Sequence, residues 1–380
     1  MGTGQSERMH ALDGVRGVAA VVVVLYHLTL MARPRLEETA GLWEWITQSP
    51  LRPLTAGSEA VLVFFVLSGL VVSIPALSAT FDWLRYYPSR LIRLYLPVIG
   101  AVLFAVALIL VVPRFPGAIS PDSWLDNRVA SSISLGRIVE ESSLLPETYT
   151  VVNVLWSLRW EVMFSVLLPV FIVVGLAVRR RPWLAAVVSV ALMVAGRVLE
   201  VDALVYLPTF FLGTLMAVHL PGIRAWADRV NRRGGWFIWG ALAVASVVLL
   251  VLSWLTRDIA PAGSSASAAL WGLAGAGAAG LIVVAIGSPL AERMLSARLP
   301  LWLGRVSFSL YLVHVPVLAS IAFLIGDAAW WLVALIAFPA SFAIAWLFHV
   351  AVETPAHRLA RRAGNRVASR HDRVPTPIAS

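Results

Sequence analysis

The sequence contains no cysteine and no lysine, and charged residues make up only 13% of its 380 positions. The absence of cysteine excludes disulfides, a thiolate nucleophile and cysteine-ligated metal sites. Soluble globular domains carry about 25% charged residues, so the low charge excludes an ordinary soluble fold as well. The formal net charge of +9 therefore comes from arginine alone on the basic side.

The chain is instead rich in hydrophobic residues, which make up 59% of it and give a mean hydropathy of +0.82. A helix that crosses a bilayer needs about 20 mostly apolar residues, and the chain offers ten runs of about this kind. We therefore predict an all-α, polytopic membrane bundle, formed by residues 1–355, with a basic, disordered tail over residues 356–380. The predicted helices cover residues 11–31, 59–77, 94–112, 156–178, 183–199, 203–219, 236–255, 267–287, 306–325 and 329–351.

The arginines gather in alternate connections between these runs, for example at Arg179–Arg181 and at Arg232 and Arg233. The positive-inside rule then predicts that both termini lie in the cytoplasm. This placement explains the high net charge by membrane topology, so we expect a lipid bilayer as partner and no nucleic acid. The arginine- and alanine-rich, lysine-free composition indicates a GC-rich bacterial genome and hence a multi-pass protein of the cytoplasmic (inner) membrane.

Arg16 and His27 lie eleven residues apart in the first predicted helix. Eleven residues turn through ~1100°, or three turns plus ~20°, so the two side chains share one face and lie ~16 Å apart along the axis. Ionisable groups within a span are costly and often functional. The same spacing also fits an interfacial ion pair of Arg16 with Asp13 and a purely structural histidine.

Other polar residues in or beside the predicted helices also have two interpretations. Arg90 and Arg93 are one turn apart, which suits phosphate binding as well as ordinary positive-inside topology. Glu161 lies deeper in its helix, where a carboxylate needs a partner or a cavity. His349 and Glu353 lie at helix ends, and we interpret them as topological residues.

Gly275, Gly277 and Gly280 form the pattern G-x-G-x-x-G. In nucleotide-binding folds this pattern follows a β-strand, whereas here it lies within an alanine-rich hydrophobic run. We therefore predict close helix packing at these glycines.

Five sequence blocks, in order along the chain, resemble motifs of acyltransferase family 3, whose members are integral membrane acyltransferases that modify glycans, lipids and antibiotics. The blocks are Leu12–Gly17 with His27, Phe64–Gly69, the R-x-x-R element Arg90–Arg93, the stretch from Trp156 to Pro169, and Ser307–His314. Many members carry two adjacent acids and a downstream tyrosine in the fourth block. This chain has Val162 and Ser165 at those positions, which leaves Glu161 as the block's sole acid.

The resemblance implies an acyl-CoA-dependent O-acyltransferase, with acyl-CoA as co-substrate and no other cofactor and no metal. We expect Arg90 and Arg93, with Arg16, to bind the phosphates of this donor. We expect His27 to act as general base on an acceptor hydroxyl and Glu161 to orient it or raise its basicity. Further expected pocket-lining residues are Ser68, Trp156, Ser309, Tyr311 and His314.

The substrates are less defined than the reaction class. We expect an acetyl group by default and, as acceptor, a sugar hydroxyl of a glycan, a glycolipid or a glycosylated metabolite. A proton-coupled secondary transporter or a lipid flippase stays open as the alternative, because many helices with buried Arg, Glu and His also suit a carrier. No pair of corresponding broken helices is evident in the sequence, which favours the enzyme.

Overall fold

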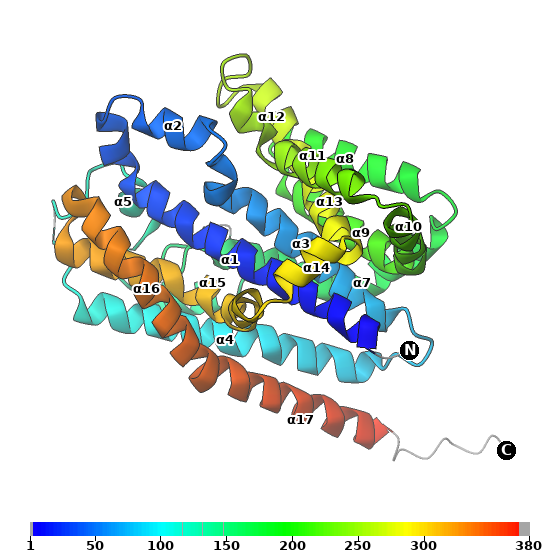
Figure 1. Ribbon diagram of the computed structural model, residues 1–380. Helices are drawn as coiled ribbons and strands as arrows, with labels where there is room; N and C mark the ends of the chain where they lie inside the picture. The colour runs from blue at the N-terminus through cyan, green and yellow to red at the C-terminus, as the bar shows by residue number, and fades with distance from the viewer. Residues whose placement is uncertain (1–2, 116, 131, 147, 372–380) are drawn as a thin grey trace.

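The computed structural model describes residues 3–115, 117–130, 132–146 and 148–371, and these form a bundle of helices without a strand (Figure 1). The predicted all-α fold is therefore confirmed. The helices are α1 (Thr3–Glu38), α2 (Leu42–Gln48), η1 (Arg52–Thr55), α3 (Gly57–Ala76), α4 (Trp83–Val111), α5 (Trp124–Arg128), α6 (Leu135–Ser142), α7 (Leu155–Ala177), α8 (Pro182–Val198), α9 (Asp202–Val218), α10 (Leu220–Arg232), α11 (Trp236–Leu255), α12 (Ser265–Gly272), α13 (Ala274–Gly287), α14 (Pro289–Leu295), α15 (Arg298–Ile325), η2 (Asp327–Ala329), α16 (Trp330–Phe348), η3 (His349–Glu353) and α17 (Thr354–His371).

All ten predicted segments fall on helices, but fewer than ten qualify as membrane spans. Within the described part of the chain, eight helical segments are long and apolar enough to cross a bilayer. Helices α9 and α10 meet at 71° and would add a ninth span if the bent pair crosses as one. Helix α8 is shorter, with 17 residues. The count of ten spans is thus not confirmed, although each hydrophobic run does form helix.

Helix α4 begins at Trp83, eleven residues before the predicted start at residue 94. The side chain of Asp82 caps this end by accepting the backbone N–H of Arg85 at 2.9 Å. Arg90 and Arg93 therefore lie inside the helix and not at its end. Hydropathy alone missed the boundary because the first turns of α4 are polar.

The predicted disordered tail is a second correction, because α17 is helical from Thr354 to His371 and lies along α4 (Figure 1). Ala356 and Ala360 are fully buried, and a Cβ at Gly364 would come within 2.9 Å of the Arg85 carbonyl oxygen. Small residues four apart give α17 a flat face that packs closely, while Arg358, Arg361, Arg362 and Arg366 are exposed. Residues 372–380 lie outside the described part.

The glycine-rich run of the eighth predicted segment is a packing surface. A Cβ at Gly277 would lie 2.5 Å from the carbonyl oxygen of Ser246 in α11, and one at Gly272 would lie 2.6 Å from the Cα of Val194 in α8. The backbones approach so closely that only glycine fits. The structure therefore supports the packing interpretation over nucleotide binding.

Candidate active site

The site is organised by α1 and α15, which lie side by side and run in the same direction. Gly17 packs on Gly304, because a Cβ at Gly17 would come 2.6 Å from the Gly304 backbone nitrogen. Ten residues further along each helix, His27 Nδ1 lies 3.2 Å from His314 Nε2. The equal step on both helices shows that they are parallel and in register.

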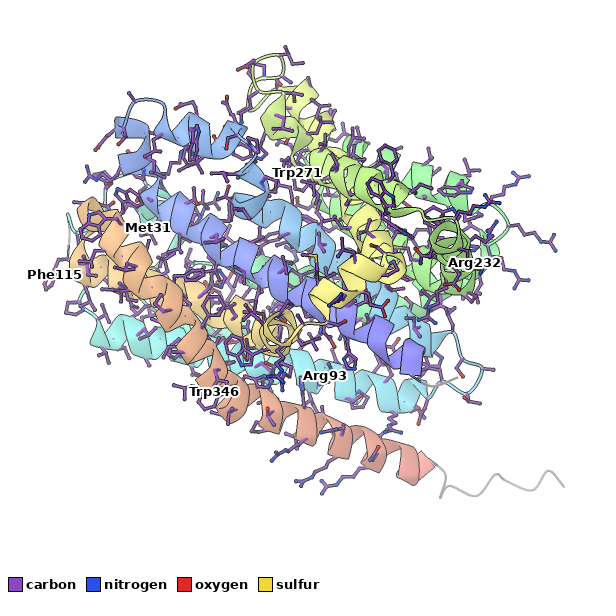
Figure 2. All side chains as sticks on the ribbon, viewed as in Figure 1. Met31, Arg93, Phe115, Arg232, Trp271 and Trp346 are labelled. Carbon is purple, nitrogen blue, oxygen red and sulfur yellow. The ribbon has the colours of Figure 1, made fainter. Side chains whose placement is uncertain are left out.

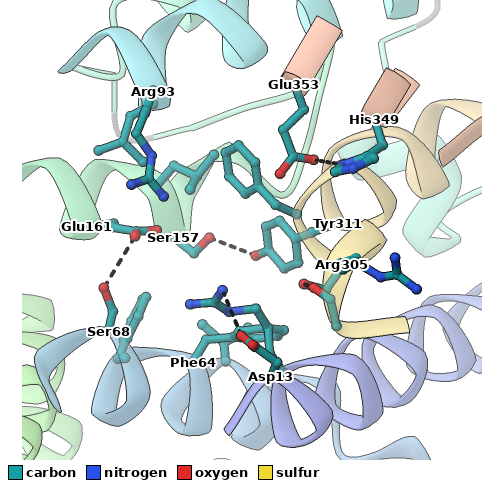
Figure 3. Close-up of a pocket in the computed structure, with 18 of the residues that line it drawn as sticks. Asp13, Phe64, Ser68, Arg93, Ser157, Glu161, Arg305, Tyr311, His349 and Glu353 are labelled. Atoms are coloured by element: carbon teal, nitrogen blue, oxygen red, sulfur yellow. Dashed lines mark hydrogen bonds and ion pairs between the residues drawn. The ribbon is translucent and has the colours of Figure 1, made fainter. Parts of the chain in front are cut away.

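A cavity of about 330 Å³ adjoins the first part of this helix pair. Its wall combines residues of α1, α3, α4, α7, α15 and the η3–α17 turn, which converge from distant parts of the sequence (Figure 3). Seven guanidinium and carboxylate side chains line it. They are the cations Arg16, Arg90, Arg93 and Arg305 and the anions Asp13, Glu161 and Glu353. Four guanidinium groups thus face three carboxylates, and the net charge of the wall is positive.

Glu161 pairs with Arg90 on the cavity wall. Arg90 Nη2 donates to Glu161 Oε1 at 2.7 Å, and the Ser68 hydroxyl donates to the same oxygen at 3.3 Å. Arg90 Nε also donates to the hydroxyl of Ser165 at 3.0 Å. The expectation that Glu161 orients His27 is replaced by this ion pair, since the carboxylate's contacts lie within the cavity.

Three other cations remain available to a bound anion. Arg16 lies 3.9 Å from Asp13 Oδ1, which is too long for a hydrogen bond. Arg93 and Arg305 are exposed, and neither has an ion pair among the described residues. Figure 3 shows Arg93 reaching into the cavity from α4. Guanidinium groups that lack a carboxylate partner, such as those of Arg93 and Arg305, are suited to phosphate.

The opposite wall carries a cluster that the sequence analysis treated as topological. Glu353 is buried and accepts the Ser309 hydroxyl at 2.6 Å, while His349 Nδ1 lies 2.9 Å from the same Oε2. His357 Nε2 lies 3.8 Å from the other carboxylate oxygen. The cluster is held by η3, a π-helical turn, and such turns are frequent at functional sites.

The histidine pair has defined proton positions. A carbonyl oxygen only accepts, so His314 Nδ1, at 2.9 Å from Leu310 O, carries a proton and its Nε2 is an acceptor. His27 Nδ1 lies between two acceptors, Val23 O at 2.8 Å and His314 Nε2 at 3.2 Å, so it carries a proton as well. In the neutral ring, Nε2 of His27 is therefore the basic nitrogen.

Tyr311 lies between the cavity and the histidine pair. Its ring lines the cavity, and its centroid is 6.0 Å from that of Phe64 and 6.1 Å from that of His314. The Tyr311 hydroxyl is 2.7 Å from the Ser157 hydroxyl, which fixes the ring across the end of the cavity (Figure 3). His27 is not part of the cavity wall and lies beyond this ring.

The long connection between α4 and α7, at residues 112–154, covers the histidine pair. Trp124 of α5 lies against His27, with ring centroids 5.1 Å apart. Buried Glu141 holds the end of the connection by accepting backbone N–H groups of Thr150, Val151 and Val152 at 2.7–3.1 Å. These contacts make the connection a cap over the histidine pair.

Burial shifts the pKa values of two groups in this connection. Burial raises the pKa of Tyr149 to about 12, so its hydroxyl stays neutral. Burial also lowers the pKa of Arg114 to about 10, which still leaves that guanidinium charged. Neither Tyr149 nor Arg114 is therefore expected to change charge near neutral pH.

The predicted site residues divide into two groups. Those on the cavity wall are Arg16, Ser68, Arg90, Arg93, Glu161 and Tyr311. The others are His27 and His314, which contact each other, Ser309, which donates to Glu353, and Trp156, which packs on Tyr206 with centroids 5.4 Å apart. Cavity residues that had no predicted role include Arg305, Ser157, His349, Glu353 and His357. The i,i+4 spacing of the last three was the available signal.

Comparison with protein families agrees with this arrangement. The family model described as an acyltransferase domain matches residues 9–350, which is most of the chain. The chain belongs to acyltransferase family 3. It is thus a multi-pass membrane acyltransferase. Searches of curated proteins and of solved structures found no significant match.

Proposed function

We propose that this acyltransferase takes an acyl group, acetyl in the simplest case, from acyl-CoA and transfers it to a sugar hydroxyl. The acceptor would be a glycan, a glycolipid or a glycosylated metabolite, and the host membrane the cytoplasmic membrane of a bacterium. One observation supports this proposal above the others. A cavity rich in guanidinium groups adjoins, through Tyr311, a histidine whose basic nitrogen is defined by hydrogen bonds.

The cavity supplies the donor site. The phosphates of acyl-CoA are anions. Arg93 and Arg305 have no carboxylate partner among the described residues, and Arg16 has only a long ion pair with Asp13, so these guanidinium groups can bind them. A hydrogen bond to a charged group contributes about 1.5–3 kcal/mol. Arg90 adds its charge to the same wall while Glu161 fixes its orientation. The narrow arm of the donor would then extend past Tyr311 and bring the thioester to the histidine pair.

The histidine pair supplies the base. His27 Nε2 takes the proton of the acceptor hydroxyl as the hydroxyl oxygen attacks the thioester carbonyl carbon. The carbon–sulfur bond then breaks, the thiolate of coenzyme A leaves, and it takes the proton from the His27 imidazolium. The new ester stays on the acceptor, and the base returns to its neutral form. Positioned base catalysis of this kind contributes about 10²–10⁴-fold to a rate.

The proposal is tested by measuring acyl transfer from acyl-CoA to an acceptor by the purified, reconstituted protein. The protein is supplied with acyl-CoA labelled in its acyl group and, in separate reactions, with a glycan, a glycolipid or a simple glycoside. Product masses are measured by mass spectrometry. We expect an acceptor to gain the mass of one acyl group only when the donor is present. Movement of the acceptor into empty proteoliposomes without donor, and no mass gain with donor, would contradict the proposal and favour a carrier.

A further inference from the structure

A second concave surface lies away from the candidate active site, between α7, α8 and α9. It encloses about 820 Å³ and shares no lining residue with the guanidinium cavity. Pockets that hold small ligands measure about 300–1,000 Å³. Its walls are almost entirely apolar, with Phe171 and Phe211 among the largest side chains and Ala185 and Ala203 among the smallest.

The groove has polar groups at one end. Ser189 lies within it, but its hydroxyl is already bound to the carbonyl oxygen of Ala185 at 2.8 Å. Arg180 and Arg181, in the turn that joins α7 to α8, form the polar end of the groove and are exposed. The groove is therefore amphipathic along its length, with an apolar body and a cationic rim.

No carboxylate neutralises this rim within the described residues. Neither Arg180 nor Arg181 has an ion pair among the interactions of the described chain. Of the acids nearest in sequence, Glu161 is paired with Arg90, and Glu200 and Asp202 lie beyond the other end of α8, which has 17 residues and is ~26 Å long. The two guanidinium groups are thus free to bind an anion from outside the chain.

We propose that the groove binds an anionic phospholipid, with its acyl chains along α7, α8 and α9 and its phosphate on Arg180 and Arg181. The surrounding bilayer presents ligands of this shape, and basic pockets between transmembrane helices commonly bind anionic headgroups. Charge complementarity selects the anionic class over zwitterionic lipid. This site does not depend on the proposed acyl transfer.

A lipid bound in the groove would stabilise the packing of α9 on α3, next to the candidate active site. The opposite side of α9 packs against α3, where Cβ atoms at Gly69 or Gly213 would collide with the facing backbone. Helix α3 carries Phe64 and Ser68 of the cavity wall. A lipid that binds the folded groove therefore stabilises the fold by mass action.

The experiment compares lipid retention on purified, full-length variants by native mass spectrometry. Phosphatidylglycerol or phosphatidylcholine vesicles supply the lipid. The double variant R180Q/R181Q removes the rim. The control of equal charge, R232Q/R233Q, removes two exposed arginines at the end of α10, where Figure 2 labels Arg232. We expect wild type and R232Q/R233Q to retain phosphatidylglycerol, and R180Q/R181Q to bind it about 30-fold more weakly, from about 1 kcal/mol per arginine.

A third variant, Ala185→Trp, fills the groove without a change of charge and should lower retention of phosphatidylglycerol, as R180Q/R181Q does. Melting temperature without added lipid shows that each variant is folded. Equal losses in both double variants would mean a general effect of surface charge and would overturn the proposal. Equal binding of phosphatidylcholine and phosphatidylglycerol by wild type, or retention of a free fatty acid in place of a phospholipid, would overturn it as well.

Discussion

The guanidinium cavity and the histidine pair lie at two levels of the same parallel helices, α1 and α15, and they differ in nearly every physical property. The cavity places four guanidinium groups and three carboxylates around open space. The histidine pair is 7% and 1% exposed, and the aromatic rings of Tyr26, Trp124 and Tyr311 surround it. Charge is concentrated at one level and nearly excluded at the other.

This difference separates phosphate binding from general base catalysis, which need opposite environments and would conflict within one pocket. A phosphate site needs several cations with room for an anion and water, because buried charges without partners are costly. A general base needs a neutral ring with its lone pair defined, which adjacent guanidinium groups would disturb. Tyr311 divides the two environments, and the predictions below alter one side at a time and, last, Tyr311 itself.

The largest effect should come from His27→Ala, which removes the proposed base. We expect the transfer rate to fall by about 10²–10⁴-fold, because general base catalysis is lost. Binding of coenzyme A, measured by calorimetry, should stay close to wild type, since the guanidinium cavity is unchanged. His10→Ala, on the exposed first part of α1, is the matched control. A His27→Ala enzyme that retained most of its rate would contradict the assignment.

On the other side of Tyr311, Arg93→Gln should weaken donor binding. Loss of one charged hydrogen bond of about 1.5–3 kcal/mol corresponds to roughly 10–100-fold in the dissociation constant of coenzyme A. We expect KM for the donor to rise and kcat to change much less. Arg298→Gln, at the exposed start of α15, serves as control. A fall in kcat with an unchanged KM would place Arg93 in the chemical step and break the division of tasks.

His314 is proposed as a positioning residue, because its Nε2 accepts the Nδ1 proton of His27. His314→Leu should lower kcat by about 10-fold, the cost of roughly one net hydrogen bond, with KM for the donor unchanged. His314→Gln retains an acceptor and should recover part of the loss. Equal kcat values for the two variants would show that His314 only fills space.

The fold was largely predictable because hydrophobic runs of bilayer length form helices wherever they occur. The boundaries of α4 and α17 were not predictable, because both helices extend through polar sequence, where a search for hydrophobic runs does not detect a helix. Asp82 caps the first end, and the Ala356, Ala360 and Gly364 face packs the second onto α4. The cap is a local contact, which a search for hydrophobic runs does not use, whereas the packing of α17 on α4 is tertiary and leaves only a weak local signal.

The site was predictable where a motif marks a residue and not where two distant residues must meet. Arg16, Arg90, Arg93 and Glu161 all reach the cavity. The expected partner of Glu161 was wrong, because nothing in the sequence shows that α4 and α7 align Arg90 with it. The contact of His27 with His314 depends in the same way on the parallel register of α1 and α15.

The smallest effect should come from Tyr311→Phe, which tests the divider itself. The ring that separates the two environments is kept, and the lost hydroxyl contact to Ser157 leaves the Ser157 hydroxyl its second partner, Val154 O, at 3.0 Å. We therefore expect transfer within a few-fold of wild type and stability lower by about 1 kcal/mol. Tyr311→Ala removes the ring and should let water reach the thioester, so acyl-CoA hydrolysis without acceptor should rise. If Tyr311→Ala shows no added hydrolysis while Tyr311→Phe abolishes transfer, the hydroxyl acts in the reaction and the ring does not divide the site.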